Sequence, residues 1–207
     1  NILIDTSPDL RSQLLSNKIK NIDRVFYTHM HADQTHGIND LRIFYLKTKK
    51  RIPIYADNLT KKYLKRSFSY CFDKNSDYPP ILKFENMKKS FLFDKSIKLL
   101  PIKVKHGSIN SLCFIINNKL AYLPDANGIY KKDFSKFKSL QYMIVDCLRY
   151  TKHPSHFNFE DIIKLNFFLK PKKMILTNLH SDLDYNELLD ILPKNIKPAY
   201  DGLSINI

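Results

Sequence analysis

Short apolar runs bounded by turn residues recur along the whole chain, and most of them end at an aspartate or a histidine. Runs of this length are typical of strands, several of them buried on both faces. The sequence predicts strands at Ile2–Ile4, Val25–Tyr27, Ile52–Tyr55, Leu99–Val104, Cys113–Ile116, Leu120–Leu123, Tyr142–Val145 and Met174–Leu176. The chain must therefore fold so that ionisable groups lie repeatedly at strand exits.

Helical segments with recognisable starts lie between these runs. Ser7 followed by Pro8 can cap and open one helix, and Asn58 can cap the Lys-rich segment that follows it. Asn158 with Asp161 at the third helical position can open another. Strands and helices both spread over the whole length, so the sequence predicts a single α/β domain over residues 1–207.

Two further segments lead to expectations about the boundaries of this domain. The chain enters the apolar run Ile2–Ile4 directly after Asn1, which we interpret as the interior of a sheet whose first strands are missing from this chain. The stretch Phe72–Pro80 is rich in turn residues and is predicted to be a surface loop or lid.

The composition is that of a globular protein. With 43% hydrophobic and 26% charged residues, a disordered or collagen-like chain is excluded. No apolar stretch of about 18 residues and no amino-terminal signal region appear, so we expect a cytoplasmic protein that does not bind membranes. Cys71, Cys113 and Cys147 are too few and too widely spaced for a disulfide scaffold or a zinc ribbon, and Cys113 and Cys147 are predicted to be core residues.

The charge of the chain is strongly positive. Its 34 Lys and Arg residues against 20 Asp and Glu residues give a net charge of +14. This excess favours an anionic partner such as a nucleic acid, a nucleotide or a membrane surface. Lysines interleaved with Ile and Asn, as in Lys18–Asn21, indicate equally well a compositional bias, so the charge alone does not identify a partner.

Five of the seven histidines lie at or just beyond predicted strand ends, namely His29, His31, His36, His106 and His180. Three aspartates, Asp5, Asp125 and Asp146, follow other strands. On the strand that ends at Val104, the period of two places His106 on the same face as Ile102 and Val104, so that its ring emerges from the apolar side. A single histidine in such a place is usually a hydrogen-bonded core residue, but five of them indicate a site.

The densest group of polar side chains is the segment Tyr27–Arg42, YTHMHADQTHGINDLR. His29 and His31 are two residues apart just after a strand, so in extended backbone both side chains point the same way and can bind one metal ion. Asp33 follows where the chain turns into a helix, and its oxygen can serve a second ion. Nitrogen and carboxylate ligands without cysteine suit zinc, manganese or iron(II) in a hydrolytic site.

The order Asp5, THMHAD, His106, Asp125, His180 resembles the metallo-β-lactamase superfamily, whose hallmark is HxHxDH followed by a distant histidine, a bridging aspartate and a last histidine. The pieces THMHADQTHGINDLR, LPDANG, DCLRYTKHPSHF and LTNLHSDLDY look like its phosphodiesterase branch, which includes the phosphoribosyl 1,2-cyclic phosphate phosphodiesterases. They are more distantly similar to the tRNA 3′-processing endonucleases. The resemblance implies an αββα sandwich with the metal site at one edge, and it implies strands before Ile2.

The resemblance also implies a ligand set. It makes His29, His31 and His106 ligands of one divalent metal ion, makes Asp33 and His180 ligands of a second, and places Asp125 between the two. Asp5 would hydrogen-bond the loop that carries His29 and His31 and so orient their rings.

One position departs from the hallmark. Gln34 stands where the motif has its last histidine, and because an amide oxygen is a weaker ligand than imidazole, the second ion should bind less tightly or be a harder ion such as manganese or magnesium. His36 lies two positions further on, about 200° round a helix, so we expect it to contact substrate or a ligand rather than a metal ion.

The predicted activity is hydrolysis of a phosphodiester, small and cyclic or nucleotide-like, by a metal-bound hydroxide with zinc or manganese. Asp33 is the candidate group that orients this hydroxide or accepts its proton, and by resemblance His156 is the candidate general acid for the leaving alkoxide. The expected partner is a small phosphate ester, and a homodimer is expected of this branch.

Two alternatives remain open. One basic segment favours an RNA- or DNA-processing nuclease of the same superfamily. It contains Lys61, Lys62, Lys65 and Arg66 beside the aromatic residues Tyr63, Phe68 and Tyr70. Gln34 favours a non-catalytic protein that binds a nucleotide or a partner at a site with a degraded second metal position.

Overall fold

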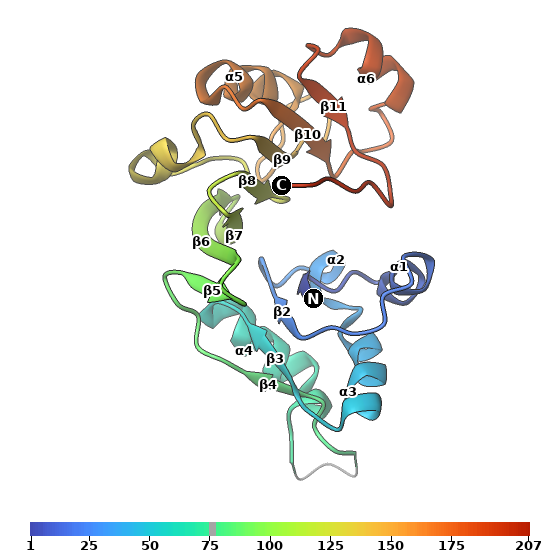
Figure 1. Cartoon of the computed structure of the whole chain (residues 1–207). Coiled ribbons are helices and arrows are strands. Elements are labelled where there is room, and N and C mark those ends of the chain that lie inside the picture. The colour runs from blue at the N-terminus through green and yellow to red at the C-terminus, as the bar shows by residue number, and fades with distance from the viewer. Residues whose placement is uncertain (75–77) are drawn as a thin grey trace. The chain divides into compact units, whose positions relative to one another are not determined.

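Two β-sheets organise the part of the chain that the structure describes, residues 1–74 and 78–207 of a computed structural model (Figure 1). Each sheet belongs to one compact unit, Asn1–Met87 or Lys88–Ile207, and each unit has its own core and its own helices. The predicted α/β class is confirmed. That residues 1–207 act as one domain stays a prediction, because each unit is compact by itself.

The amino-terminal unit has a four-stranded parallel sheet in the order β1-β2-β3-β4. Its strands are β1 (Ile2–Ile4), β2 (Arg24–Phe26), β3 (Ile52–Tyr55) and β4 (Leu82–Phe84). Its helices are α1 (Leu10–Ser16), α2 (Ala32–Thr35), α3 (Arg42–Thr48) and α4 (Asn58–Ser67), with 3₁₀ turns η1 (Ile38–Leu41) and η2 (Ser69–Cys71). Apolar residues of β2 and β3 form its core with the buried faces of these helices.

The parallel pairing of β1 and β2 brings their carboxyl ends together. Ile4 lies opposite Phe26, and the Asp5 N–H donates to the Phe26 carbonyl at 2.8 Å. Gly37, directly before η1, donates its N–H to the Thr6 carbonyl at 2.9 Å. A side chain at Gly37 would collide with the Ser7 carbonyl, so only glycine lets the segment after β2 pack this closely against the segment after β1.

The carboxyl-terminal unit has a seven-stranded mixed sheet in the order β11-β10-β9-β8-β7-β6-β5. The strands are β5 (Phe91–Phe93), β6 (Ile97–His106), β7 (Ile109–Ile116), β8 (Leu120–Leu123), β9 (Tyr142–Asp146), β10 (Lys173–Thr177) and β11 (Ile196–Pro198). The helices are α5 (Phe159–Leu169) and α6 (Tyr185–Ile191), with the 3₁₀ segment η3 (Lys131–Phe137). Alternate residues of β9 and β10 are buried in one core with residues of both α-helices.

Strands β8, β9 and β10 are parallel neighbours, so their carboxyl ends lie side by side. Leu123 pairs with Val145, and Asp146 pairs with Thr177. The chain segments that leave these strands therefore start from one edge of the sheet, and this edge carries Asp125, Asp146 and Asn178.

All eight predicted strands are present, with ends shifted by a few residues. The sequence did not reveal β4, β5 or β11, each of which is only three residues long. Asn158 and Asp161 form the predicted capping box of α5. The prediction for the Lys-rich helix was wrong by one residue, because the Asp57 carboxylate accepts from the Thr60 N–H and Asn58 is already helical.

The first predicted helix also starts later than expected. Asp9 rather than Ser7 precedes α1, and the Ser7 hydroxyl donates to the Gln13 side chain instead of capping the helix. In the predicted loop Phe72–Pro80, the described residues on either side form neither helix nor strand, and residues 75–77 lie outside the described part of the chain.

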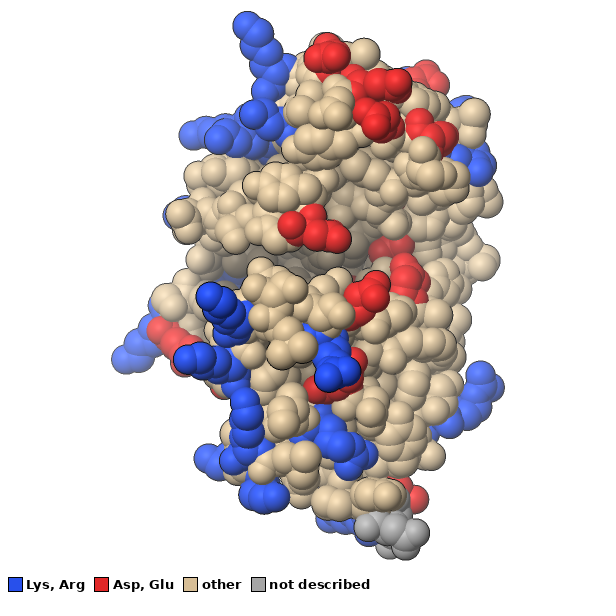
Figure 2. All heavy atoms as spheres, turned by 90° about the vertical axis from the view of Figure 1, so that its right-hand side faces the viewer, with Lys and Arg blue, Asp and Glu red and all other residues tan. Residues whose placement is uncertain are grey.

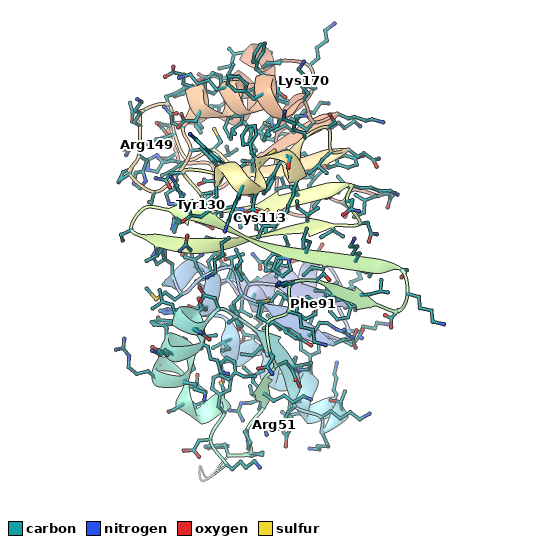
Figure 3. All side chains as sticks on the ribbon, turned by 90° about the vertical axis from the view of Figure 1, so that its left-hand side faces the viewer. Arg51, Phe91, Cys113, Tyr130, Arg149 and Lys170 are labelled. Carbon is teal, nitrogen blue, oxygen red and sulfur yellow. The ribbon has the colours of Figure 1, made fainter. Side chains whose placement is uncertain are left out.

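The cysteines are buried, as predicted for Cys113 and Cys147. Cys113 lies within β7 (Figure 3), and burial raises the pKa of all three thiols, to about 11 for Cys71 and about 12 for Cys147. Such thiols are poor nucleophiles at neutral pH. Among the described helices, none has the length and apolar character needed to cross a membrane.

Candidate metal centre

In the amino-terminal unit, a chain of hydrogen bonds runs from Asp5 to the two histidines of the HxH segment. The Asp5 carboxylate accepts from the Thr28 N–H and from the Thr28 hydroxyl, both at 2.8 Å. The Thr28 hydroxyl also lies 3.1 Å from His29 Nδ1. His29 Nε2 lies 2.9 Å from His31 Nδ1. Asp5, Thr28 and His29 are buried, whereas His31 is exposed.

These contacts determine which ring nitrogen of His29 carries a proton. The Thr28 hydroxyl has one proton, which it donates to Asp5, so it must accept from His29 and Nδ1 must carry a proton. The lone pair of the ring is then on Nε2, which faces His31 Nδ1. Two imidazole nitrogens at this separation either share a proton or bind one cation, so the pair fits a divalent metal ion.

The backbone of Asp5 explains why an aspartate stands there. Its φ of 61° lies in the left-handed region, which aspartate tolerates better than most residues. Its carboxylate thereby reaches back to Thr28, the residue directly before His29. Thr28 was not recognised as a site residue in the sequence, and its only signal there is its place directly before His29.

Asp33, Gln34 and His36 lie on or next to the short helix α2. The Gln34 side-chain N–H donates to the Asp33 carboxylate at 2.7 Å. His36 points elsewhere, since its Nε2 lies 3.1 Å from the Tyr63 hydroxyl and its ring packs edge-on against Phe68. His36 therefore contacts α4 and the residue that follows it rather than the histidine pair.

In the carboxyl-terminal unit, His106, Asp125 and His156 form a compact group of potential ligands. One ligand atom from each lies within 4.8 Å of the others. His106 ends β6 and is buried on the same face as Ile102 and Val104, as the alternation of that strand predicted. Its Nδ1 donates to the Ser155 carbonyl at 2.8 Å, because a carbonyl can only accept, so Nε2 carries the lone pair.

His156 is held by a second buried carboxylate. Its Nδ1 lies 2.7 Å from Asp146 Oδ2 and 3.8 Å from Asp125 Oδ1. Burial raises the pKa of Asp146, and the neighbouring His156 opposes this shift. A carboxylate in this position fixes the ring and stabilises its protonated form, so that Nε2 can present a proton.

The sequence placed Asp146 at a strand exit but gave it no role. Its only signal was that position, because its partner His156 is ten residues away on the segment after β9. The neighbouring His153 has a lowered pKa, chiefly from burial, and its Nδ1 accepts from the Ser155 N–H at 3.3 Å. His153 therefore contacts its own loop, whereas His156 contacts Asp146.

His180 lies on the segment after β10, and its predicted role as a ligand of a second ion stays a prediction. Its side chain is 57% exposed, and Nδ1 lies 3.0 Å from Asp182 Oδ1. Among the described residues it is not a member of the group formed by His106, Asp125 and His156. Asn178, two residues earlier and directly after β10, lies there instead, with its side-chain nitrogen 3.4 Å from Asp125 and 3.3 Å from Asp146.

A comparison with family models matches residues 1–178 to the β-lactamase superfamily domain. The chain belongs to the metallo-β-lactamase superfamily. This family confirms the fold class expected from the sequence motifs, and it is a family of metal-dependent hydrolases whose fold implies divalent metal ions.

Solved structures of the superfamily are similar to the chain over nearly its whole length. A diphosphatase from the PhnP family is 31% identical, with a TM-score of 0.89 over 98% of this chain and 77% of its own. This likeness places the chain in the phosphodiesterase branch. The short form of human tRNase Z is 17% identical, with a TM-score of 0.72 over 100% of this chain and 88% of its own, which shows a common fold.

One curated relative of this chain is a longer protein. The octanoyltransferase of Porphyromonas gingivalis (strain ATCC BAA-308 / W83) is 32% identical over 207 residues, which cover 98% of this chain and 41% of that protein. The chain thus spans about two fifths of the length of this relative.

The Asp5–Thr28 hydrogen bonds lead to a prediction about metal affinity. Asp5→Asn keeps the size of the side chain and tolerates the left-handed backbone, but an amide cannot accept both protons from Thr28. We expect the affinity for Zn²⁺ to fall by about 10- to 100-fold in a competition titration with a chromophoric chelator. Asp9→Asn, an exposed aspartate four residues later, is the matched control. Equal affinity of both variants and the unaltered chain would contradict the role of Asp5.

Proposed function

We propose that this superfamily member is a metal-dependent phosphodiesterase that cleaves a small cyclic or nucleotide-like phosphodiester. The observation that carries the proposal is the group His106, Asp125 and His156, backed by the buried Asp146. It combines donors for a divalent cation with an imidazole that can deliver a proton. The identity of 31% to a diphosphatase of the PhnP family supports the same class of substrate.

By the ligand order of the family, His29, His31, His106 and Asp125 would hold a divalent cation, zinc or manganese. The proposal is supported by the chemistry of these donors, since His29 and His106 each commit Nδ1 to an oxygen and keep a lone pair on Nε2. A divalent cation, when bound, lowers the pKa of water and draws charge from phosphoryl oxygens.

The remaining steps are assigned to side chains of the chain itself. Asp33, an exposed carboxylate in the first turn of α2, accepts the proton of the attacking water. His156 donates the proton on Nε2 to the oxygen of the leaving group. Asp146 holds His156 Nδ1 throughout, so the ring stays oriented and its protonated form is stabilised when the proton is needed.

Removal of a ligand tests the assignment. His106→Ala and Asp125→Ala each delete one donor of the cation, and we expect hydrolysis of bis(p-nitrophenyl) phosphate in the presence of Mn²⁺ to fall at least about 100-fold. Asp190→Ala, an exposed aspartate of α6, is the control and should retain full activity. Full activity in both ligand variants would show that the site is wrongly assigned.

The role of His156 as general acid predicts a dependence on the leaving group. An alkoxide must be protonated as it leaves, whereas p-nitrophenolate needs no proton. His156→Ala should therefore lower kcat on an alkyl phosphodiester by about 10²- to 10⁴-fold and on the p-nitrophenyl ester much less.

The matched control for this test is His153→Ala, because the two rings are 5.0 Å apart on the same loop. The control should lower the rates on both esters by the same small factor. If His156→Ala lowered both rates equally, His156 would have a structural role or bind the cation.

A second candidate function, processing of RNA or DNA, is favoured by one surface of the amino-terminal unit. Lys61 and Lys65 lie over the Phe84 ring, 5.2 and 5.7 Å from its centre, and Phe72 stacks on Phe84 at 4.5 Å. These side chains line a cavity of about 480 Å³ with Arg51, which Figure 3 labels just before β3. Figure 2 shows further Lys and Arg side chains over this unit, on the face opposite to that of Figure 3.

Cations beside stacked aromatic rings are typical of surfaces that bind single strands. If this candidate is correct, a single-stranded oligonucleotide binds at low salt, and Lys61→Ala with Lys65→Ala reduces the slope of log K against log salt by about 1.4. Lys18→Ala with Lys20→Ala, on exposed residues of the same unit, should leave the slope unchanged. Absence of binding at low salt, measured by fluorescence anisotropy, would exclude a nuclease.

A further inference from the structure

In the amino-terminal unit, an amide occupies the position that the family hallmark gives to an imidazole. Gln34 directs its side-chain N–H at Asp33, at 2.7 Å. An amide nitrogen has no lone pair to offer a cation, and its partly positive hydrogens stabilise the negative charge of the carboxylate it faces. If the amide were reversed, its oxygen would lie against an anionic oxygen and the hydrogen bond would be lost.

The carboxyl-terminal unit repeats this arrangement independently. Asn178 directs its side-chain nitrogen at the buried carboxylates Asp125 and Asp146, at 3.4 and 3.3 Å. Because both partners only accept, the amide must present N–H groups to them. His180, the imidazole expected here, is exposed and paired with Asp182.

We propose that the chain binds one divalent cation and that amide hydrogens of Gln34 and Asn178 take the place of the second. An ion that needs imidazole ligands does not fit these two positions, because Gln34 and Asn178 each present amide N–H groups to a carboxylate. The inference rests on the proposed function in one respect, namely that His29, His31, His106 and Asp125 bind the first cation.

The inference changes the role of Asp33. Without a second cation to coordinate, its carboxylate is held by Gln34 and available to accept a proton. Asp33→Asn should therefore lower activity while the amount of bound metal stays the same. His106→Ala, by contrast, should lower both.

The test is the metal content of the full chain after equilibrium dialysis against Mn²⁺ or Zn²⁺, measured by plasma mass spectrometry. We expect about one ion per chain. Two ions per chain would overturn the inference and leave the proposed phosphodiesterase intact. No bound ion would overturn the proposed function itself and favour a protein that binds its partner without metal.

Replacing both amides by imidazoles gives the variant that tests the number of bound ions most directly. Gln34→His combined with Asn178→His should raise the content to about two ions per chain. Histidine also tolerates the left-handed backbone of residue 178, whose φ is 60°, so this unit should still fold. An unchanged melting temperature verifies folding, and failure of the folded double variant to bind a second ion would contradict the proposal.

Two controls separate this effect from the mere addition of histidines. Gln13→His with Asn186→His makes the same exchanges on exposed residues of α1 and α6, and it should leave the content at one ion. His180→Ala should also leave the content at one ion. A loss of metal in His180→Ala would show that His180 is a ligand and would overturn the inference.

Discussion

The hydrogen bonds that fix the imidazole rings are the constraint on which the site depends. A histidine binds a cation only through a nitrogen that has a lone pair, and which nitrogen that is depends on the partner of the other one. In this chain the Thr28 hydroxyl, held by Asp5, commits His29 Nδ1, and the Ser155 carbonyl commits His106 Nδ1. Because His29 and His106 are buried, leaving either contact unmade would cost about 1–3 kcal/mol.

In both units, the ends of parallel strands bring the polar side chains together. In each, parallel neighbouring strands end at one edge of a sheet, and the residues that follow the strands turn their side chains towards one another. β1 and β2 place Asp5 beside Thr28, and β8, β9 and β10 place Asp125, Asp146 and Asn178 together. The short apolar runs of the sequence thus determine both the cores and the places of the polar groups.

The parts of the site that could be predicted from the sequence are those set by local geometry. The alternation along β6 gave the buried face of His106, and the spacing of two gave the convergence of His29 and His31. The capping box of α5 was also readable, because both of its residues lie within one turn.

Contacts made in three dimensions could not be read in the same way. The partnership of His156 with Asp146 depends on where the segment after β9 returns to the sheet. Asn178, directly after β10, has a left-handed backbone with a φ of 60°. This turn of the chain places its side chain at the carboxylates, and His180 contacts Asp182. The sequence motif favours His180 as the functional residue, whereas the backbone brings Asn178 to Asp125 and Asp146.

Nitrogen-detected NMR of histidine-labelled protein shows which ring nitrogens carry protons. In the metal-free chain, His29 and His106 should be protonated on Nδ1, and addition of Zn²⁺ should shift the Nε2 signals of both. The signals of His36 and His180 should stay unchanged. Protonation of His29 and His106 on Nε2, or a response to Zn²⁺ confined to His36 and His180, would show that these two rings do not bind the cation through Nε2.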